Sequence, residues 1–260
     1  MPNPPQPPVK ISIVIPVWNE ADTIDTVLSD LADAFDGAAG FEVLCINDGS
    51  DDATADTIRA RMTTLPWLRL VHHQTRSGKS AGLRTAALYA RGDWIVTMDG
   101  DGQNLASDIR TIADRVAALS DRPSPLLAGV RVDRQDTRSR LIASRIANPI
   151  RRWALGDDCP DSGCGVKAYR RDAFLLLPTF EGMHRFLPAL FKLYGHPVVL
   201  HPIAHRARLG GVSKYSNWRR AFVGVFDLIG VLWLRRRTRL PAVEGDGRID
   251  GAWAQHHDPR

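Results

Sequence analysis

The sequence predicts an α/β fold in which a mostly parallel sheet is flanked by helices. Three observations support this class. Short β-branched apolar runs alternate with segments of helical periodicity, which is typical of βαβ units. Polar, glycine-containing clusters directly follow three of these runs. A chain of 260 residues that is 44% hydrophobic and 24% charged has the composition of a globular domain, which excludes disorder and fibrous repeats.

The first half of the chain carries the regular alternation. Residues 11–17 predict a buried strand, and Asn19 is a candidate cap for the helix that follows. Further strands are expected over 41–46, 68–72 and 93–98, and further helices over 53–62 and 80–90. The clusters WNE, NDGS and DGDGQ follow three of the strands, so they mark the sheet edge where open α/β sheets bind ligands.

The second half is less regular. We expect one strand over 125–131 and a late strand over 196–205. Between them, residues 138–155 form a basic amphipathic segment that Pro149 should interrupt, because proline removes a helix hydrogen bond.

The two ends of the chain differ from its middle. Residues 1–10 are proline-rich and lack the apolar core of a signal peptide, so a disordered leader and no export by that route are expected. Residues 238–260 are polar and predict a flexible tail. Three cysteines without a CxxC pair exclude a disulfide framework and a structural zinc site, and they favour a reducing cytosol.

Residues 221–234 form a nearly continuous apolar run with a single charge, Asp227. Spanning a bilayer takes about 20 residues, so the run is too short for a transmembrane helix. Arginines flank the run at 219, 220 and 235–237, which is the composition of an amphipathic helix lying in a membrane interface. A core helix is the alternative, and the flanking arginines favour the membrane.

Charge is distributed unevenly along the chain. Residues 1–130 carry 11 basic and 17 acidic residues, whereas residues 131–240 carry 21 and 8. This asymmetry indicates a cation site in the first half and an anion or anionic surface in the second. Nucleic-acid binding is a remote alternative, because the basic run 131–152 contains no aromatic residue on which a base could stack.

Asp99, Asp101 and Gln103 follow a predicted strand in the sequence MDGDGQ. Alternate residues at a strand end can point to one side, so two carboxylates and an amide oxygen can meet on one hard cation. A solvated acidic turn is the alternative for the bare motif, and the position after a buried strand favours the cation site.

Two more groups in the first half are candidates for ligand contact. Asp48, in NDGSDD, can accept a hydrogen bond from a base or ribose, or it can belong to a turn that caps the next helix through Ser50. The residues GKS at 78–80 resemble the end of a phosphate-binding P-loop, but His73 stands where the loop's first glycine belongs. The P-loop pattern therefore fails, which argues against a nucleoside triphosphatase. Lys79 and Arg76 are candidates for an anion, with a solvated helix start as the alternative.

Two basic clusters lie in the second half. Both have few acidic neighbours, which suits phosphate binding, although charge runs are commonly solvated faces. The first contains Arg131, Arg134, Arg138, Arg140 and Ser144, and the second contains Arg206, Arg208 and Lys214. His184 and Arg185, in GMHRF, match no metal-ligand spacing and are expected to be packing or surface residues.

The order of the motifs resembles that of family 2 glycosyltransferases of GT-A fold, a Rossmann-like architecture. The motifs are IPVWNE, NDGSDD, RSGKSAGLRTA, MDGDGQ, GVR, RxxxS, DSGCGVKAY and GGVSKY, and the resemblance covers roughly residues 11–237. Within the family the chain looks most like the polyprenyl-phosphate branch of dolichol-phosphate mannose and glucose synthases. The resemblance implies a metal-dependent, inverting transfer of a hexose from a nucleotide sugar, of the GDP-mannose or UDP-glucose type, to a dolichyl or undecaprenyl phosphate.

The resemblance also implies roles for individual residues. Around the nucleotide sugar it implies Pro16, Trp18, Glu20, Asp48, Asp99, Arg208 and Lys214, with Trp18 standing where the family usually has Tyr, and we assign Lys79 to the same site from its own charge. It implies Asp99, Asp101 and Gln103 as ligands of Mg²⁺ or Mn²⁺, and Arg131, Arg140, Ser144 and Asp161 around the acceptor phosphate. The residues to which we assign catalysis are Asp101, Arg131 and Arg140.

The implied domain organisation follows these roles. A catalytic domain over 11–216 would divide into a nucleotide-sugar and metal half over 11–130 and an acceptor half over 131–216, followed by an interfacial helix over 217–237. Relatives in this branch often carry transmembrane helices after the catalytic domain, and this chain shows none, so we expect a peripheral enzyme at the cytoplasmic face, bound through 221–234.

The chemistry fits an acceptor that needs no base. A lipid monophosphate is already anionic at neutral pH, so cations that orient its oxygen can replace a general base. The alternative within the family is transfer to a sugar hydroxyl in polysaccharide or glycolipid assembly. That reaction would need a carboxylate base, for which Asp161 is the only candidate.

Overall fold

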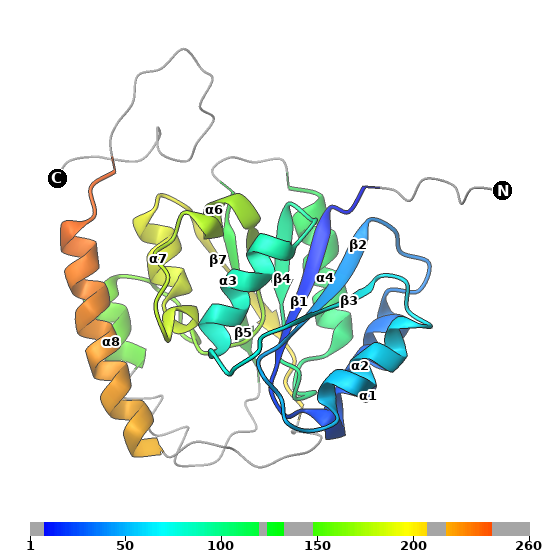
Figure 1. The fold of residues 1–260 in the computed structure, drawn as a ribbon. Coiled ribbons are helices and arrows are strands. Elements are labelled where there is room, and N and C mark those ends of the chain that lie inside the picture. The colour runs from blue at the N-terminus through cyan, green and yellow to red at the C-terminus, as the bar shows by residue number, and fades with distance from the viewer. Residues whose placement is uncertain (1–7, 120–123, 133–147, 207–216, 241–260) are drawn as a thin grey trace.

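The fold was analysed in a computed structural model, which describes residues 8–119, 124–132, 148–206 and 217–240 (Figure 1). In the helix over 217–237, the side chains are described from residue 223 onward. The elements are β1 (Ile11–Val17), α1 (Ala21–Ala34), β2 (Phe41–Asn47), α2 (Thr54–Met62), β3 (Leu68–His72), α3 (Lys79–Tyr89), β4 (Trp94–Thr97), α4 (Ala106–Ala117), β5 (Leu126–Arg131), β6 (Lys167–Arg170), α6 (Arg171–Leu175), the 3₁₀ helix η1 (Met183–Arg185), α7 (Leu187–Leu193), β7 (Val198–Ile203) and α8 (Asn217–Arg237).

The strands form a mostly parallel seven-stranded sheet in the order β3-β2-β1-β4-β6-β5-β7. Strand β6 is antiparallel to both of its neighbours, and the other pairings are parallel. This confirms the predicted fold class. Strand β6 itself was not predicted, because four residues that include a lysine carry little strand signal.

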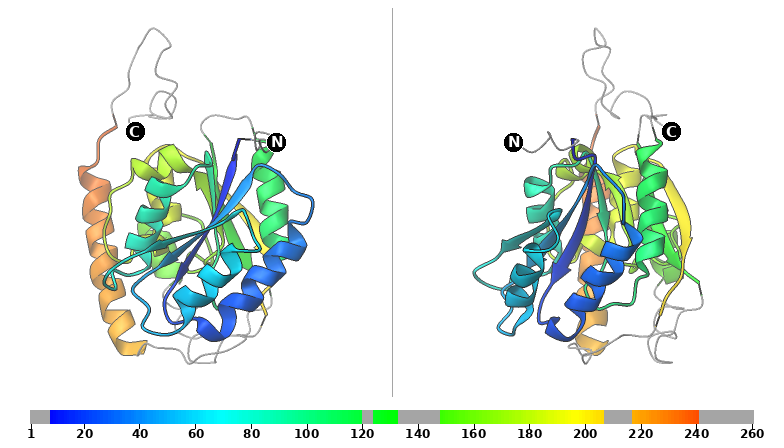
Figure 2. Two further views of the ribbon diagram at one scale, coloured as in Figure 1. Left: turned by 45° about the vertical axis from the view of Figure 1, so that its right-hand side comes forward. Right: turned by 90° about the vertical axis from the view of Figure 1, so that its right-hand side faces the viewer.

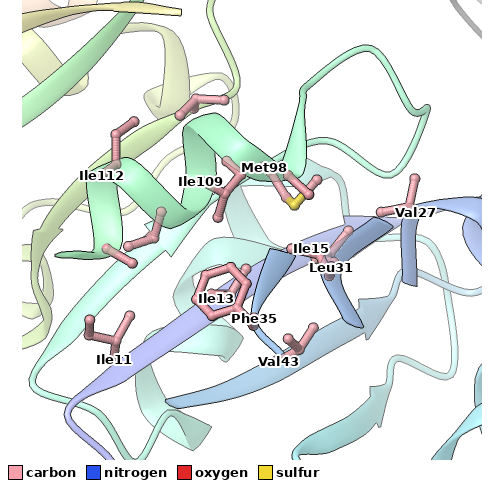
Figure 3. Packing of buried hydrophobic residues seen from close by; sticks show 14 of the residues in the cluster. Ile11, Ile13, Ile15, Val27, Leu31, Phe35, Val43, Met98, Ile109 and Ile112 are labelled. Atoms are coloured by element: carbon pink, nitrogen blue, oxygen red, sulfur yellow. The ribbon is translucent and has the colours of Figure 1, made fainter. Parts of the chain in front are cut away.

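Helices cover both faces of the sheet (Figure 2). Successive strand residues point to opposite faces, so Ile13 and Ile15 pack with α1, α2 and α4, whereas Val14 packs with α3, α6, α7 and α8. Figure 3 shows the first cluster, where the side chains of β1 and β2 meet those of α1 and α4. The near-continuous apolar runs of the sequence follow from burial on both faces.

The predicted strands are confirmed, and so are the helices after β1, β2 and β3. Helices α4, α6 and α7 were not predicted. Of the basic segment 138–155, residues 138–147 lie outside the described residues, and 148–155 are helical with Pro149 in the first described turn. The interruption expected at Pro149 stays a prediction, because the residues that precede 148 lie outside the described ranges.

Helix α8 has two different sides: one packs in the core, as the alternative interpretation of the run 221–234 expected, and the membrane interpretation stays a prediction. Val231 is only 3% exposed and packs in the second cluster, together with Leu228, Leu232 and Leu234. On the other side, Phe226, Ile229 and Trp233 are 60%, 58% and 64% exposed. Among the described residues, no helix is long and apolar enough to cross a membrane.

Candidate active site

The carboxyl ends of β1, β2 and β4 meet at one edge of the sheet, as the sequence predicted. The amide of Asp48, after β2, donates to the carbonyl of Val17 in β1 at 2.9 Å. The hydroxyl of Thr23, in the first turn of α1, donates to the carbonyl of Gly100 at 2.8 Å. Because β6 is antiparallel, its first residue lies beside the end of β4, which brings the preceding DSGCGV segment to the same edge.

Asp99 lies at the centre of this edge, directly after β4. Its carboxylate forms an ion pair with the ammonium of Lys79, the first residue of α3. Its backbone amide donates to Oδ1 of Asn104 at 3.0 Å. The carboxylate lies so close to Gly165 that a Cβ atom at position 165 would overlap it. A side chain at position 165 would therefore force the Asp99 carboxylate to move.

Positive charge surrounds this carboxylate. Burial raises the pKa of Asp99, but the cations of Lys79, Lys167 and Arg131 outweigh burial and hold that pKa below its ordinary value. Lys167 is itself buried, and its ammonium donates to the carbonyls of Ser162, at 3.0 Å, and Cys164. Burial lowers the pKa of Lys167. Arg131 also pairs with Asp161, and Asp101 lies two residues from Asp99, so three cations and three carboxylates come together here, as a metal and its phosphate ligands would require.

The turn that carries Asp101 and Gln103 is held by Arg206. The amide of Gln103 donates to Oδ1 of Asp101 at 3.2 Å. The Arg206 side chain donates to the carbonyl of Gly102, and its backbone amide donates to the carbonyl of Gln103 at 3.1 Å. Its guanidinium also pairs with Asp30 of α1 at 2.5 Å. Arg206, which the sequence placed in a phosphate-binding cluster, thus supports the aspartate turn.

The donor atoms of this turn fit a hard divalent cation. Asp99, Asp101 and Gln103 offer carboxylate and amide oxygens, which Mg²⁺ and Mn²⁺ prefer. Within the described ranges, no group of three or more His, Cys, Asp or Glu side chains is arranged to hold a metal. A metal at Asp99 and Asp101 would therefore need further oxygen ligands, such as the amide of Gln103 and the phosphates of a nucleotide.

Asp48 holds the loop that precedes α3. Its carboxylate accepts hydrogen bonds from the amides of Ser77, at 2.8 Å, and Gly78, at 2.7 Å, and it contacts Nδ1 of His73 at 2.9 Å. His73, whose presence breaks the P-loop pattern, is thus part of the loop's support. A nucleoside contact by Asp48 remains a prediction.

The residues at the end of β1 form the next part of the edge. Trp18 is half-buried, and the guanidinium of Arg76 lies over its ring, 3.5 Å from the centroid. Pro16 is half-buried at the end of β1, and Glu20 precedes α1, with its carboxylate 3.3 Å from the Thr23 hydroxyl oxygen. Trp18 lies at the predicted nucleoside position, and Arg76 covers one face of its ring.

Arg131, the last residue of β5, pairs with Asp161 in a bidentate arrangement. Its Nε and Nη2 atoms donate to the two carboxylate oxygens at 2.7 and 2.9 Å. The side chain of Asp161 is 5% exposed. The other predicted phosphate contacts, Arg140, Ser144, Arg208 and Lys214, lie outside the described residues.

His184, which the sequence analysis expected to be a packing or surface residue, packs beside the site through Ser80. Its Nδ1 atom lies 2.9 Å from the hydroxyl of Ser80, which also accepts the His184 amide at 3.4 Å. Burial, together with Lys79, Arg185 and Lys167, lowers the pKa of His184 well below its ordinary value, so the ring is neutral at pH 7. More than 100 residues separate His184 from Ser80 in sequence, and no motif signals their contact.

Comparison with known proteins agrees with this geometry. The family model "Glycosyl transferase family 2" matches residues 12–176. The chain is 32% identical over 244 residues to the dodecaprenyl-phosphate galacturonate synthase of Rhizobium johnstonii, covering 92% of this chain and 71% of the relative. It is 29% identical over 225 residues to the undecaprenyl-phosphate 4-deoxy-4-formamido-L-arabinose transferase of Salmonella choleraesuis, covering 86% and 67%.

A solved structure shows the same fold. Glucosyl-3-phosphoglycerate synthase from Mycobacterium tuberculosis, in complex with Mn²⁺, UDP and glucosyl-3-phosphoglycerate, matches with a TM-score of 0.67 at 19% identity, covering 90% of this chain and 82% of that one. The family model covers more than half of the chain, and the Rhizobium relative exceeds 30% identity. This chain therefore belongs to the family 2 glycosyltransferases, has the GT-A fold, and has polyprenyl-phosphate sugar transferases among its relatives.

Proposed function

We propose that this enzyme transfers a hexose-type sugar from a nucleoside diphosphate sugar to a polyprenyl phosphate, with Mg²⁺ or Mn²⁺ and with inversion at the anomeric carbon. The observation that carries the proposal is the cluster of Lys79, Lys167 and Arg131 around Asp99 at the sheet edge. Both substrates carry phosphate groups and the proposed metal needs carboxylates, so a site that brings cations and carboxylates together suits them.

The donor is assigned to the ends of β1, β2 and β4. Trp18 is assigned to stack on the base, which requires the ring face opposite Arg76 or displacement of Arg76, and Pro16, Glu20 and Asp48 are assigned to the same nucleoside site. Asp99, Asp101 and Gln103 would hold the metal, whose chemistry is to neutralise the departing nucleoside diphosphate. Lys79 is close enough to the metal ligands to bind a phosphate oxygen, and Arg208 and Lys214 are assigned to the phosphates from the sequence.

The acceptor phosphate is assigned to Arg131, Arg140 and Ser144, with Asp161 beside them. A phosphate monoester oxygen is already a nucleophile at neutral pH, so the protein's task is to orient it toward the anomeric carbon. Arg131 suits this role because its planar guanidinium, which here binds the Asp161 carboxylate in a fork, recognises phosphate in the same way.

Transfer to a sugar hydroxyl receives less support. It requires a carboxylate base, and Asp161 was the candidate. Both oxygens of this carboxylate accept from Arg131, and the side chain is nearly fully buried. A carboxylate held in this way is poorly placed to take a proton from a substrate.

Attachment to the cytoplasmic face of a membrane is assigned to the exposed side of α8. Phe226, Ile229 and Trp233 lie on that side. Trp153, on the helical segment 148–155, is 88% exposed, and Arg235 of α8 donates to the carbonyl of Ala154 at 3.1 Å, so the two segments are neighbours. Replacing Phe226 and Trp233 with Ser should reduce sedimentation with anionic liposomes, and equal sedimentation of the variant would remove this assignment.

A donor screen tests the proposed reaction. Purified enzyme, a polyprenyl phosphate and either Mg²⁺ or Mn²⁺ are incubated with radiolabelled nucleotide sugars, and lipid-linked label is extracted. We expect transfer from at least one donor, dependent on the metal, and an acid-labile phosphate-linked product. Transfer to a glycan hydroxyl with no lipid-phosphate product would contradict the proposal.

A further inference from the structure

We propose that η1 is a positioning element that links the packing of α8 to Lys79, with His184 holding Ser80 on one side and Arg185 holding Asp227 on the other. The inference rests on the proposed donor site, and it assigns a role to residues that the donor and acceptor assignments leave unused. It predicts that breaking a contact of α8 weakens the binding of a nucleotide at the other end of this chain of contacts.

The first link joins η1 to the beginning of α3. Ser80 is 3% exposed, and its hydroxyl meets both the ring and the amide of His184. The His184 amide donates to the Ser80 oxygen, so the hydroxyl hydrogen is available for Nδ1 of the neutral ring. Ser80 immediately follows Lys79, so these two bonds fix the helix turn from which the Lys79 ammonium reaches Asp99.

The second link joins η1 to α8. The Arg185 guanidinium donates to Oδ2 of Asp227 at 3.0 Å, and both side chains are less than half exposed. Asp227 is the single acidic residue in the apolar run 221–234, and it lies on the buried side of the helix, four residues before Val231. An acidic residue at this position is costly unless it is paired, so Arg185 explains its presence.

Gly182 shows how closely the parts of this link fit. Its φ of 83° lies in the left-handed region. A Cβ atom at this position would lie 2.6 Å from Oδ2 of Asp227 and 2.8 Å from Nη2 of Arg185. A glycine therefore permits the approach of α8 to η1, and a side chain at 182 would push the ion pair apart.

Together the two links form a continuous path from α8 to the metal ligand. It runs from Asp227 through Arg185 and the adjacent His184 to Ser80, and from the adjacent Lys79 to Asp99. Spatial continuity alone does not establish coupling, so the test must measure an effect at one end of the path after a change at the other.

Nucleotide binding to the full chain provides this test. The dissociation constants of UDP and GDP are measured by titration calorimetry with MnCl₂, and the nucleotide that binds the unmodified enzyme more tightly is used. The variants are Asp227→Asn, Gly182→Ala, His184→Ala, His184→Asn and the reversed pair Arg185→Asp with Asp227→Arg. Lys79→Met is the reference at the site. Asp172→Asn is the matched control, because it breaks an ion pair with Arg170 that lies outside the path.

We expect Asp227→Asn, Gly182→Ala and His184→Ala to weaken nucleotide binding by about threefold to tenfold, which lies in the lower part of the range measured for interacting residues. His184→Asn should recover much of the loss, because an amide can hydrogen bond with Ser80. The reversed pair should bind more tightly than Asp227→Asn alone, and Asp172→Asn should bind normally. In turnover assays the donor KM should rise more than the acceptor KM, which a general loss of folded protein would not produce.

The outcomes separate this inference from the proposed function. If Lys79→Met weakens binding and the α8 and η1 variants do not, the positioning role of η1 is wrong and the donor site stands. If Lys79→Met itself has no effect, Lys79 is not a donor-site residue, and both the inference and that part of the proposed function fall. If Asp227→Asn does not fold, Gly182→Ala and the reversed pair give the same comparison.

Discussion

Strands β2 and β4 end in similar sequences, NDGS and MDGDGQ, but their aspartates have different surroundings. Asp48, after β2, is bound by the backbone amides of Ser77 and Gly78 and by His73. Asp99, after β4, is bound by the long side chain of Lys79, with two further cations near it. Backbone donors cannot leave without unfolding the loop, whereas a lysine can move to another anion. The comparison teaches that Asp48 supports the backbone of the loop before α3, whereas Asp99 is held by a side chain that can exchange it for another anion.

The largest effect is expected when the available carboxylate is removed. Asp99→Ala should lower the transfer rate by at least about 100-fold, since it removes a proposed metal ligand and leaves an excess of positive charge. The thermal midpoint should change by only a few degrees, because Asp99 is partly exposed. Both are measured on the same preparation. Near-normal transfer would show that Asp99 does not serve the reaction.

A smaller loss of activity is expected from Gly165→Ala. The added Cβ overlaps the Asp99 carboxylate and forces it to move, with Asp99 itself unchanged. We expect transfer to fall by about tenfold and the metal concentration for half-maximal rate to rise, as follows from a small displacement of a binding group. Gly163→Ala is the matched control, because a Cβ there meets no atom within 4 Å. Equal rates in the two variants would contradict this account of Gly165.

Asp48→Ala should lower the free energy of unfolding more than it lowers the transfer rate. It removes the charged acceptor of the part-buried Ser77 and Gly78 amides, and hydrogen bonds to a charged group contribute about 1.5–3 kcal/mol of unfolding free energy. Chemical denaturation measures this loss. Asp51→Ala is a useful comparison, because Asp51 is exposed. A stable Asp48→Ala variant with abolished donor binding would instead support the nucleoside contact.

The smallest effect is the pH dependence of the Asp99 contribution. Its pKa is lowered in the folded chain from an ordinary value of 3.8, so its ion pairs stabilise the fold above about pH 4 and are lost as pH falls through the folded pKa. The stability difference between the unmodified enzyme and Asp99→Asn should therefore shrink below pH 4. Denaturation at pH 3 and pH 7 measures it, and a difference that grows in acid would reverse the assigned sign.

The parallel part of the fold was predictable from local patterns, because each strand and each polar cluster is contiguous in the sequence. Strand β6 escaped prediction because it is short, although its reversed direction brings Gly165 and Lys167 to the site. His184 escaped because its partner, Ser80, lies in a different sheet crossover. Spacing identifies ligands that share one turn, and it gives no information about side chains that meet only after the sheet forms.

The two sides of α8 have a mechanical consequence. Because Val231, Leu228 and Leu232 belong to the core cluster, the helix cannot rotate about its axis without disrupting that cluster. Any surface that binds Phe226, Ile229 and Trp233 must therefore hold the whole domain, and the sheet edge with it, at one fixed inclination. Binding through this side of helix α8 would therefore fix the orientation of the domain relative to the bound surface.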